Sequence, residues 1–228
     1  MVPALKLAVF DLDGTLVDSA HMIDAAMARA FAGLSLARPA PEAVRRVVGL
    51  PLETAIARLA PELEGPVHGE LAELYKDSFF AMRESGELAE ALFPGVVETL
   101  DALEGDGWLL GIATSKSMRG LSATLAGFGL TGRFVTLRCV DFDAGKPAPD
   151  MLLAAMAETG AAPHETIMVG DTTYDVEMAR AARVPAIGVG WGFHGAGELA
   201  AAGAAEVIAH MGALPAAAGR ALAGGDAP

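Results

Sequence analysis

Short apolar runs alternate with segments of mixed polarity along most of the chain. The apolar runs have the length and composition of buried strands, and they fall at residues 6–10, 108–113, 134–140, 166–169, 185–189 and 206–208. Apolar positions at helical spacing occupy the segments between them, at 95–105, 118–127, 149–160, 173–182 and 196–203. Strands separated by helices of about ten residues are typical of a parallel sheet that helices cover on both faces. The pattern therefore predicts an α/β fold.

The segment 18–90 interrupts this alternation. It contains no convincing strand, and helical spacing recurs at 20–33, 41–48, 52–60 and 67–84, with prolines between these stretches. A crossover between parallel strands needs about a dozen residues, and this connection is far longer. We therefore predict an all-helical subdomain, residues 17–90, inserted into an α/β core made of residues 1–16 and 91–228. The tail after Pro215 is rich in Ala and Gly, and we expect it to fray.

Composition and charge narrow the class of protein. The 228 residues carry a net charge of −13 with no basic stripe, which disfavours nucleic acid and anionic membranes as partners. No uninterrupted apolar stretch is long enough to span a bilayer, and the run before Asp11 lacks the cleavage site of a signal peptide. The single cysteine, Cys139, lies in an apolar run and fits a reducing compartment. We expect a cytoplasmic protein that is a monomer or a homodimer.

The first candidate chemistry lies at the end of the first apolar run, in the stretch AVFDLDGT at residues 8–15. If Asp11 and Asp13 are both extended, their side chains face the same side, because residues i and i+2 of a strand do so. Two close carboxylates raise each other's pKa unless a cation compensates their charge, and carboxylate oxygens are ligands that Mg²⁺ prefers. A carboxylate can also attack phosphorus. The same residues make a good turn, so this stretch alone does not decide between a structural and a catalytic role.

Three later strand ends carry further polar residues. Thr114 and Ser115 follow one strand, where either hydroxyl can also cap a helix. Lys146 stands in GKPAPD before another helix, and a helix start explains the prolines there but not the lysine. Asp171 and Asp175 follow a third strand in VGDTTYD, where they can also serve as helix-capping acids. Because ligands of open α/β sheets bind beyond the carboxyl ends of the strands, we expect these residues to meet there.

Taken together, these groups suit a metal ion and a phosphate. Acids bind the metal, and a metal with a lysine suits a phosphate that peptide N–H groups at Gly14 and at helix starts can hold. In their order and spacing, DLDGT at 11–15, Thr114-Ser115, Lys146 and GDTTYD at 170–175 resemble the four motifs of the haloacid dehalogenase superfamily. The resemblance covers nearly the whole chain and is closest to the Mg²⁺-dependent, phosphoglycolate phosphatase-like group. It implies a Rossmann-like, doubly wound parallel sheet with a helical cap.

The resemblance also implies a role for each acid. Asp11 would be the nucleophile, and Asp13 would protonate the leaving alcohol and then activate water against the resulting aspartyl-phosphate. The superfamily's metal ligands fall on four residues of this chain, with the main-chain carbonyl serving at the second: Asp11, Asp13, Asp171 and Asp175. The metal would be Mg²⁺, and Asp175 would bind it directly or lie beside it.

The phosphoryl oxygens would be held by a second set of groups. The resemblance assigns this role to the side chains of Thr114 and Lys146 and to main-chain N–H groups at Leu12, Gly14 and Ser115. Many relatives have asparagine at the position of Ser115, and we expect only the backbone of that residue to matter. The inserted helices would form a mobile cap over the site. The implied reaction is hydrolysis of a small phosphorylated metabolite, either phosphoglycolate-like or a sugar phosphate.

Other functions on the same fold stay open. A phosphomutase of the β-phosphoglucomutase type keeps both aspartates, and a pyrophosphatase is a further alternative. A binding module without activity would be expected to lack a catalytic position, and none is missing. A dinucleotide fingerprint, Gly190, Gly192 and Gly195, comes after the fifth strand and lacks its acid. We expect it to form a loop at the rim of the site, where Trp191 or His194 touches the substrate or the cap.

The residues that choose the substrate are expected in the cap. Arg45 and Arg46 precede the turn VVGLP, which can approach the site and bring an arginine to a substrate carboxylate. We favour a solvated helix end for both arginines. The sequence therefore indicates a reaction and leaves its substrate undecided.

Overall fold

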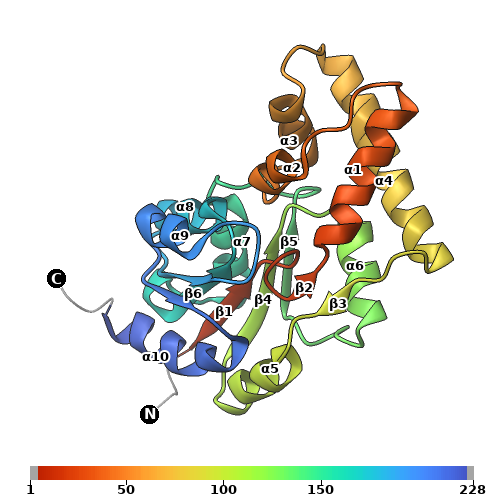
Figure 1. Cartoon of the computed structure of the whole chain (residues 1–228). Helices are drawn as coiled ribbons and strands as arrows, with labels where there is room; N and C mark the ends of the chain where they lie inside the picture. Colours follow the sequence, from red (N-terminus) through yellow and green to blue (C-terminus); the bar gives the residue numbers. More distant parts are fainter. Residues whose placement is uncertain (1–4, 225–228) are drawn as a thin grey trace.

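Six parallel strands form the sheet of the computed structural model, which describes residues 5–224. They are β1 (Leu7–Phe10), β4 (Leu109–Thr114), β5 (Thr136–Cys139), β6 (Thr166–Gly170), β7 (Ala186–Val189) and β8 (Glu206–Ile208). Their order is β5-β4-β1-β6-β7-β8 (Figure 1). The chain runs outward from β1 through β4 to β5 and then returns to β6 on the other side of β1, so the topological switch point lies beside β1. The predicted Rossmann-like, doubly wound α/β class is confirmed.

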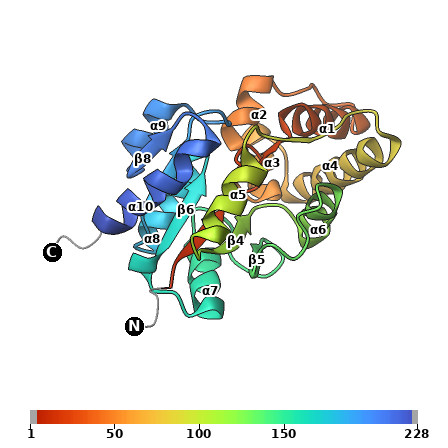
Figure 2. The same ribbon diagram turned by 90° about the horizontal axis from the view of Figure 1, so that it is seen from below.

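Helices cover both faces of this sheet. One face carries α5 (Val96–Gly105), α6 (Met118–Gly127) and α10 (Leu214–Gly224), of which Figure 2 shows α5 and α10 side by side. The other face carries α7 (Asp150–Thr159), α8 (Thr173–Ala181) and α9 (Ala196–Ala202), and the short helices η1 (Pro163–Glu165) and η2 (Met211–Ala213) complete the core. Along β1, Ala8 and Phe10 pack into the first layer, whereas Leu7 and Val9 pack into the second. The inner strands β1, β4, β6 and β7 are buried on both faces and are largely continuous apolar runs, whereas the edge strands β5 and β8 include partly exposed polar residues.

The expectation that the tail frays after Pro215 is wrong for residues 215–224. These residues belong to α10, in which Leu214, Ala217 and Ala218 are fully buried in the core. Alanine has the highest helix propensity, and its small side chain lets the helix lie close to the sheet. Pro215 in the first turn is compatible with a helix start. Residues 225–228 of the predicted tail lie outside the described residues.

Four helices form a separate cluster inserted after the first strand. They are α1 (Ala20–Gly33), α2 (Pro41–Val47), α3 (Leu52–Leu59) and α4 (Gly65–Ser85), and we call them the cap. Their shared core includes Met22, Ala26, Ile56, Leu71 and Met82. The cap joins the sheet through β2 (Val17–Asp18) and β3 (Ala91–Leu92), an antiparallel pair that the sequence analysis did not anticipate. The inserted helical subdomain is thus present. Its exact limits at residues 17 and 90 stay a prediction, and residues 1–4 of the predicted core lie outside the described part.

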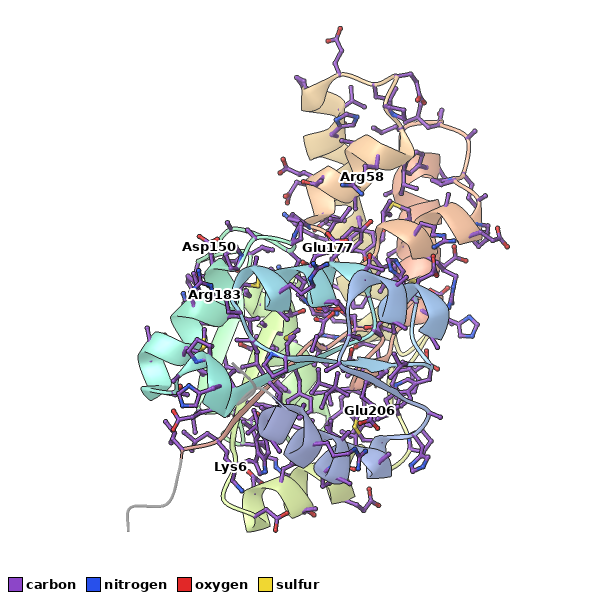
Figure 3. All side chains as sticks on the ribbon, turned by 90° about the vertical axis from the view of Figure 1, so that its left-hand side faces the viewer. Lys6, Arg58, Asp150, Glu177, Arg183 and Glu206 are labelled. Carbon is purple, nitrogen blue, oxygen red and sulfur yellow. The ribbon has the colours of Figure 1, made fainter. Side chains whose placement is uncertain are left out.

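The cap lies beyond the carboxyl ends of the strands (Figure 1). Figure 3 places Lys6 and Glu206, at the amino ends of β1 and β8, far from the cap, whereas Arg58 of α3 lies above Glu177 of α8. Arg58 donates a hydrogen bond to the Tyr174 hydroxyl across this junction, at 3.1 Å. Within residues 5–224, none of the helices combines the length and the apolar character that a membrane crossing requires.

Candidate active site

Asp11 and Lys146 form a buried ion pair directly after β1. The main-chain N–H of Asp11 donates to the Val169 carbonyl of β6 at 2.9 Å, which extends the sheet by one residue. The Asp11 carboxylate accepts from the Leu12 N–H at 2.7 Å and lies 2.8 Å from the Lys146 ammonium. Lys146 comes from the loop between β5 and α7, and its Nζ also lies 2.6 Å from Asp175. Lys146 is 1% exposed, so water does not screen these contacts.

Three buried acids gather around this lysine. One carboxylate oxygen from each of Asp11, Asp171 and Asp175 lies within 4.8 Å of the others. The Asp171 carboxylate accepts from the Thr15 hydroxyl and from the Phe193 N–H, both at 2.8 Å. These bonds fix the orientation of Asp171 from two directions, so the cluster is held in place before any ligand arrives.

Asp175 is fixed by the first turn of α8. Its carboxylate accepts from the Thr172 N–H at 3.0 Å and from the Thr172 hydroxyl at 2.7 Å. The Thr172 hydroxyl in turn accepts from the Asp175 N–H, which makes a capping box. The sequence analysis expected that helix capping and a functional role can both hold for the acids of this segment; the N-cap itself is Thr172. Capping occupies one Asp175 oxygen, and the other faces Lys146.

Glycines make room for the carboxylates. A Cβ atom at Gly14 or Gly192 would lie within 3.0 Å of Asp171, and one at Gly170 would lie equally close to Asp175. Gly14 also has a φ of +86°, a conformation that favours glycine. Only glycine at these three positions lets the carboxylates of Asp171 and Asp175 lie this close to the backbone. Gly192, which the sequence analysis considered as part of a dinucleotide fingerprint, instead makes room for the Asp171 side chain.

The charges of the cluster do not balance. Burial raises the pKa of Asp11 to about 7; Lys146 opposes this rise and Asp175 adds to it. Burial, with Asp11 and Asp175 nearby, also raises the pKa of Asp171 well above its ordinary value. Burial disfavours the charged form of Lys146, but the same two acids outweigh it and raise the pKa of that group. Three acids thus share one lysine, and an all-oxygen donor set short of positive charge fits a hard divalent cation such as Mg²⁺.

Asp13 has a different partner. It lines the same cavity as Asp11, as predicted, but its side chain lies outside the three-acid cluster. Both Asp13 oxygens accept from the Lys116 ammonium, at 2.9 and 3.0 Å. The same Lys116 Nζ lies 3.6 Å from Glu90 and 4.5 Å from the centre of the Phe79 ring. The sequence analysis missed Lys116, although its place directly after Thr114-Ser115 in a chain with few lysines was a usable signal.

Thr114 is the last residue of β4, and Ser115 follows it, so both lie at the strand end as predicted. The Thr114 side chain is buried, and its hydroxyl accepts from the Lys116 N–H at 3.3 Å. The Ser115 hydroxyl donates to the Gly49 carbonyl at 2.6 Å. Gly49 belongs to the VVGLP turn, so this turn of the cap does reach the site. The Ser115 side chain therefore connects core and cap, a role that the sequence analysis did not give it.

The two cap arginines are exposed, as expected, but they also contact the core. Arg45 donates to the Gly192 carbonyl at 3.0 Å and lies over the Phe193 ring, and Arg46 pairs with Glu198 of α9. The loop 190–195 is thus a rim of the site that touches the cap through Phe193, which packs against the core of the cap.

Trp191 and His194 both contact the core, and the Arg46 backbone of the cap also lies close to His194. Trp191 Nε1 donates to the Thr15 carbonyl at 3.2 Å, and the His194 ring accepts from the Thr173 N–H at 3.0 Å. His194 is buried, and burial lowers its pKa. Both side chains therefore hold the rim loop against the core, next to the residues that position Asp171 and Asp175.

A cavity of about 470 Å³ opens between the cap and the ends of the strands. Asp11, Asp13, Thr114, Ser115 and Lys116 line its core side, and all four cap helices contribute to the opposite wall. Four strand ends thus bring their polar residues to one place, and that place has room for a small molecule next to the Asp11 carboxylate.

Comparison with known proteins agrees with this geometry. The sequence model of the haloacid dehalogenase-like hydrolases matches residues 8–189. A probable phosphatase, IndB of Dickeya dadantii, is 41% identical over 200 residues that cover 86% of both chains. A phosphoglycolate phosphatase of Agrobacterium fabrum is 34% identical over 84% of this chain and 83% of its own. A hydrolase from Pseudomonas syringae, 27% identical, superposes with a TM-score of 0.84 over 94% of this chain and 98% of its own.

Proposed function

The chain belongs to the haloacid dehalogenase-like hydrolase family, and we propose that it hydrolyses a small phosphate monoester through an aspartyl-phosphate on Asp11, with Mg²⁺ as cofactor. Phosphatases among its relatives support the reaction class. The observation that carries the proposal is the position of Asp11, a buried carboxylate that lines the cavity beside Lys146 and two further acids.

In the first half-reaction, an Asp11 oxygen attacks phosphorus and the bond from phosphorus to the ester oxygen breaks. Asp13, in its protonated form, gives its proton to that oxygen, and the alcohol leaves. In the second, the Asp13 carboxylate takes a proton from water as the water oxygen attacks phosphorus. The bond to Asp11 breaks, which releases phosphate and restores both acids. Asp13 suits this exchange because it lines the same cavity as Asp11 and lies outside the acid cluster.

The phosphoryl oxygens need donors on the same side as Asp11. The Lys146 ammonium and the Leu12 N–H already point at the Asp11 carboxylate, at 2.8 and 2.7 Å. We assign them to the phosphoryl group together with the Thr114 hydroxyl and the Ser115 N–H. The Gly14 N–H, which the sequence analysis gave the same role, instead donates to the Val17 carbonyl at 2.8 Å. Stabilising charge on these oxygens is the main task in phosphoryl transfer.

The metal would be held by Asp11, Asp171 and Asp175, with the Asp13 main-chain carbonyl as a further ligand. When bound, Mg²⁺ supplies positive charge that polarises the phosphoryl group and compensates the buried acids. We leave Asp175 as either a direct ligand or a neighbour, because one of its oxygens is occupied by Thr172.

The test is phosphate release from phosphoglycolate, sugar phosphates, nucleoside monophosphates and pyrophosphate, with Mg²⁺ and with chelator. The wild type should release phosphate only with Mg²⁺, and Asp11→Asn should release none. Conversion of a hexose 1-phosphate into its isomer without phosphate release would instead identify a phosphomutase. Release that continues in Asp11→Asn at the wild-type rate would contradict the proposal.

A further inference from the structure

The cap wall of the cavity is mainly apolar. Side chains from three cap helices and the turn between α2 and α3 face the space above Asp11 and Asp13, and each is buried: Ile23, Met27, Val44, Val47, Leu50 and Phe79. A substrate that fills the cavity contacts these side chains and removes the surface that they still expose to the cavity from water, which favours binding by about 25 cal/mol per Å² of apolar surface buried. A strongly hydrated leaving group would gain nothing from this wall.

Helix α4 adds aromatic surface to that wall. Tyr75, Phe79 and Phe80 all line the cavity, and the Tyr75 and Phe79 rings lie 6.0 Å apart at a tilt of 37°. Burial raises the pKa of Tyr75, so its hydroxyl stays neutral. The other polar residues that the structure describes on the cap side of the cavity are Glu53, Thr54 and Lys76. Predominantly apolar and aromatic walls with a few polar groups are typical of pockets for small organic ligands.

The cations of the cavity wall are already paired. Among the described lining residues, only Lys76 and Lys116 are cationic. Lys116 is held between Asp13 and Glu90, and Lys76 pairs with Glu73 at 2.7 Å. Acids outnumber these lysines along the wall, because Asp11, Asp13, Glu53 and Asp141 all contribute to it. A second negative charge on the substrate therefore meets more acids than lysines, and both lysines already have acidic partners.

Arg45 does not change this balance. The sequence analysis considered it as a partner for a substrate carboxylate, but its guanidinium lies over Phe193 and donates to Gly192, and it does not line the cavity. A volume of about 470 Å³ also falls in the range of pockets that enclose drug-sized ligands. A two-carbon acid would leave most of the apolar wall in contact with water.

From these observations we infer that the ester hydrolysed here carries an uncharged, largely apolar leaving group that is bulkier than a two-carbon acid. The inference rests on the proposed phosphatase function and narrows its substrate class. Phosphoryl binding stays with Lys146, Thr114 and the backbone N–H groups, and the cap wall selects the alcohol. The chain would then differ in substrate from relatives that are named as phosphoglycolate phosphatases.

A pair of isosteric substrates tests the inference directly. Isobutyl phosphate and phosphoglycolate have leaving groups of the same shape, one ending in two methyl groups and the other in a carboxylate. Glycolate is at least as good a leaving group as isobutanol. A higher rate for the isobutyl ester would therefore not reflect intrinsic reactivity. We expect kcat/KM with Mg²⁺ to be about tenfold or more higher for isobutyl phosphate, the size of effect that one small apolar group has in an apolar pocket. Benzyl phosphate, which reaches the aromatic wall, should be better still.

A charge placed on the wall should change this preference. Val48 lines the cavity and is half-buried, so Val48→Lys can be accommodated and adds an unpaired cation. This variant should lower the ratio of kcat/KM for isobutyl phosphate over phosphoglycolate about tenfold or more, because the added ammonium attracts the carboxylate of phosphoglycolate and makes the wall less apolar. Ala43→Lys makes the same change of charge at an exposed position of α2 that does not line the cavity, and it should leave the ratio unchanged.

The outcomes separate the two proposals. A wild-type preference for phosphoglycolate, or for a sugar phosphate over both alkyl esters, would overturn the inference and leave the phosphatase standing. An equal change of the ratio in Val48→Lys and Ala43→Lys would also overturn it, because the cavity wall would then not select the leaving group. If the folded protein with Mg²⁺ released phosphate from no ester, the proposed function itself would fail.

Discussion

Asp11→Asn removes one of three buried carboxylates, and its effect on stability should depend on pH. The pKa of Asp11 rises from 3.8 to about 7 in the fold, chiefly because burial disfavours its charged form. The change is about 3 pH units, and each unit corresponds to about 1.4 kcal/mol. Keeping Asp11 ionised in the metal-free fold therefore costs about 4 kcal/mol at high pH.

The sign follows from proton binding in the two states. Below about pH 4 Asp11 is protonated in both the folded and the unfolded chain. Between about pH 4 and pH 7 the unfolded chain loses this proton and the folded chain keeps it. The free energy of unfolding of the metal-free protein should therefore fall as pH rises through this window. Asp11→Asn does not titrate, so its free energy of unfolding should fall by about 4 kcal/mol less.

Denaturant unfolding with chelator, at about pH 5 and about pH 8, measures the part of this difference that arises above pH 5, about 3 kcal/mol. Asp77→Asn, which changes an exposed acid of α4, is the matched control and should follow the wild type. Saturating Mg²⁺ should stabilise the wild type, and more at the higher pH, because the metal binds the ionised acids. If the wild type with chelator and Asp11→Asn show the same pH dependence, burial does not raise the pKa of Asp11 in the folded protein.

Three further predictions concern two residues at the acid cluster and one residue of the core. Lys146→Met should abolish phosphate release and lower the free energy of unfolding by about 3–5 kcal/mol, because it leaves buried acids without their cation; urea titration and a phosphate assay check both. Gly192→Ala should lower stability and activity, because its Cβ would collide with Asp171, whereas Gly197→Ala on α9 should be neutral or up to about 1 kcal/mol more stable in the same assays. Leu214→Ala should cost about 2–5 kcal/mol in urea titration, since Leu214 is fully buried; an unchanged midpoint would mean that α10 does not pack on the sheet.

The sequence predicted most of the sheet and the polar residues around Asp11. Fully buried parallel strands appear in a sequence as continuous apolar runs, and the residues that follow such strands meet at one edge of the sheet. The sequence therefore predicts that DLDGT, Lys146 and GDTTYD lie close together. The helical insertion was equally visible, because a connection of that length between neighbouring parallel strands needs its own fold.

Other features depend on contacts that no local pattern reports. The pairing of Asp13 with Lys116 joins residues far apart in the chain, and so does the bond from Ser115 to Gly49. Helix α10 was missed because its Ala- and Gly-rich sequence is also typical of a frayed tail, and only packing on the sheet decides between the two. The mainly apolar character of the cap wall could not be predicted either, because the cap helices share their apolar residues between their own core and the cavity.

The central claim is that Asp11 becomes phosphorylated, and Asp13→Asn tests it most directly. This variant lacks the base that activates water, but p-nitrophenyl phosphate needs no acid to expel its leaving group. With Mg²⁺ we predict a burst of one nitrophenol per protein molecule, and mass spectrometry should find one phosphoryl group on the peptide that contains Asp11. Sustained release of nitrophenol without an adduct, or an adduct on another residue, would contradict the account.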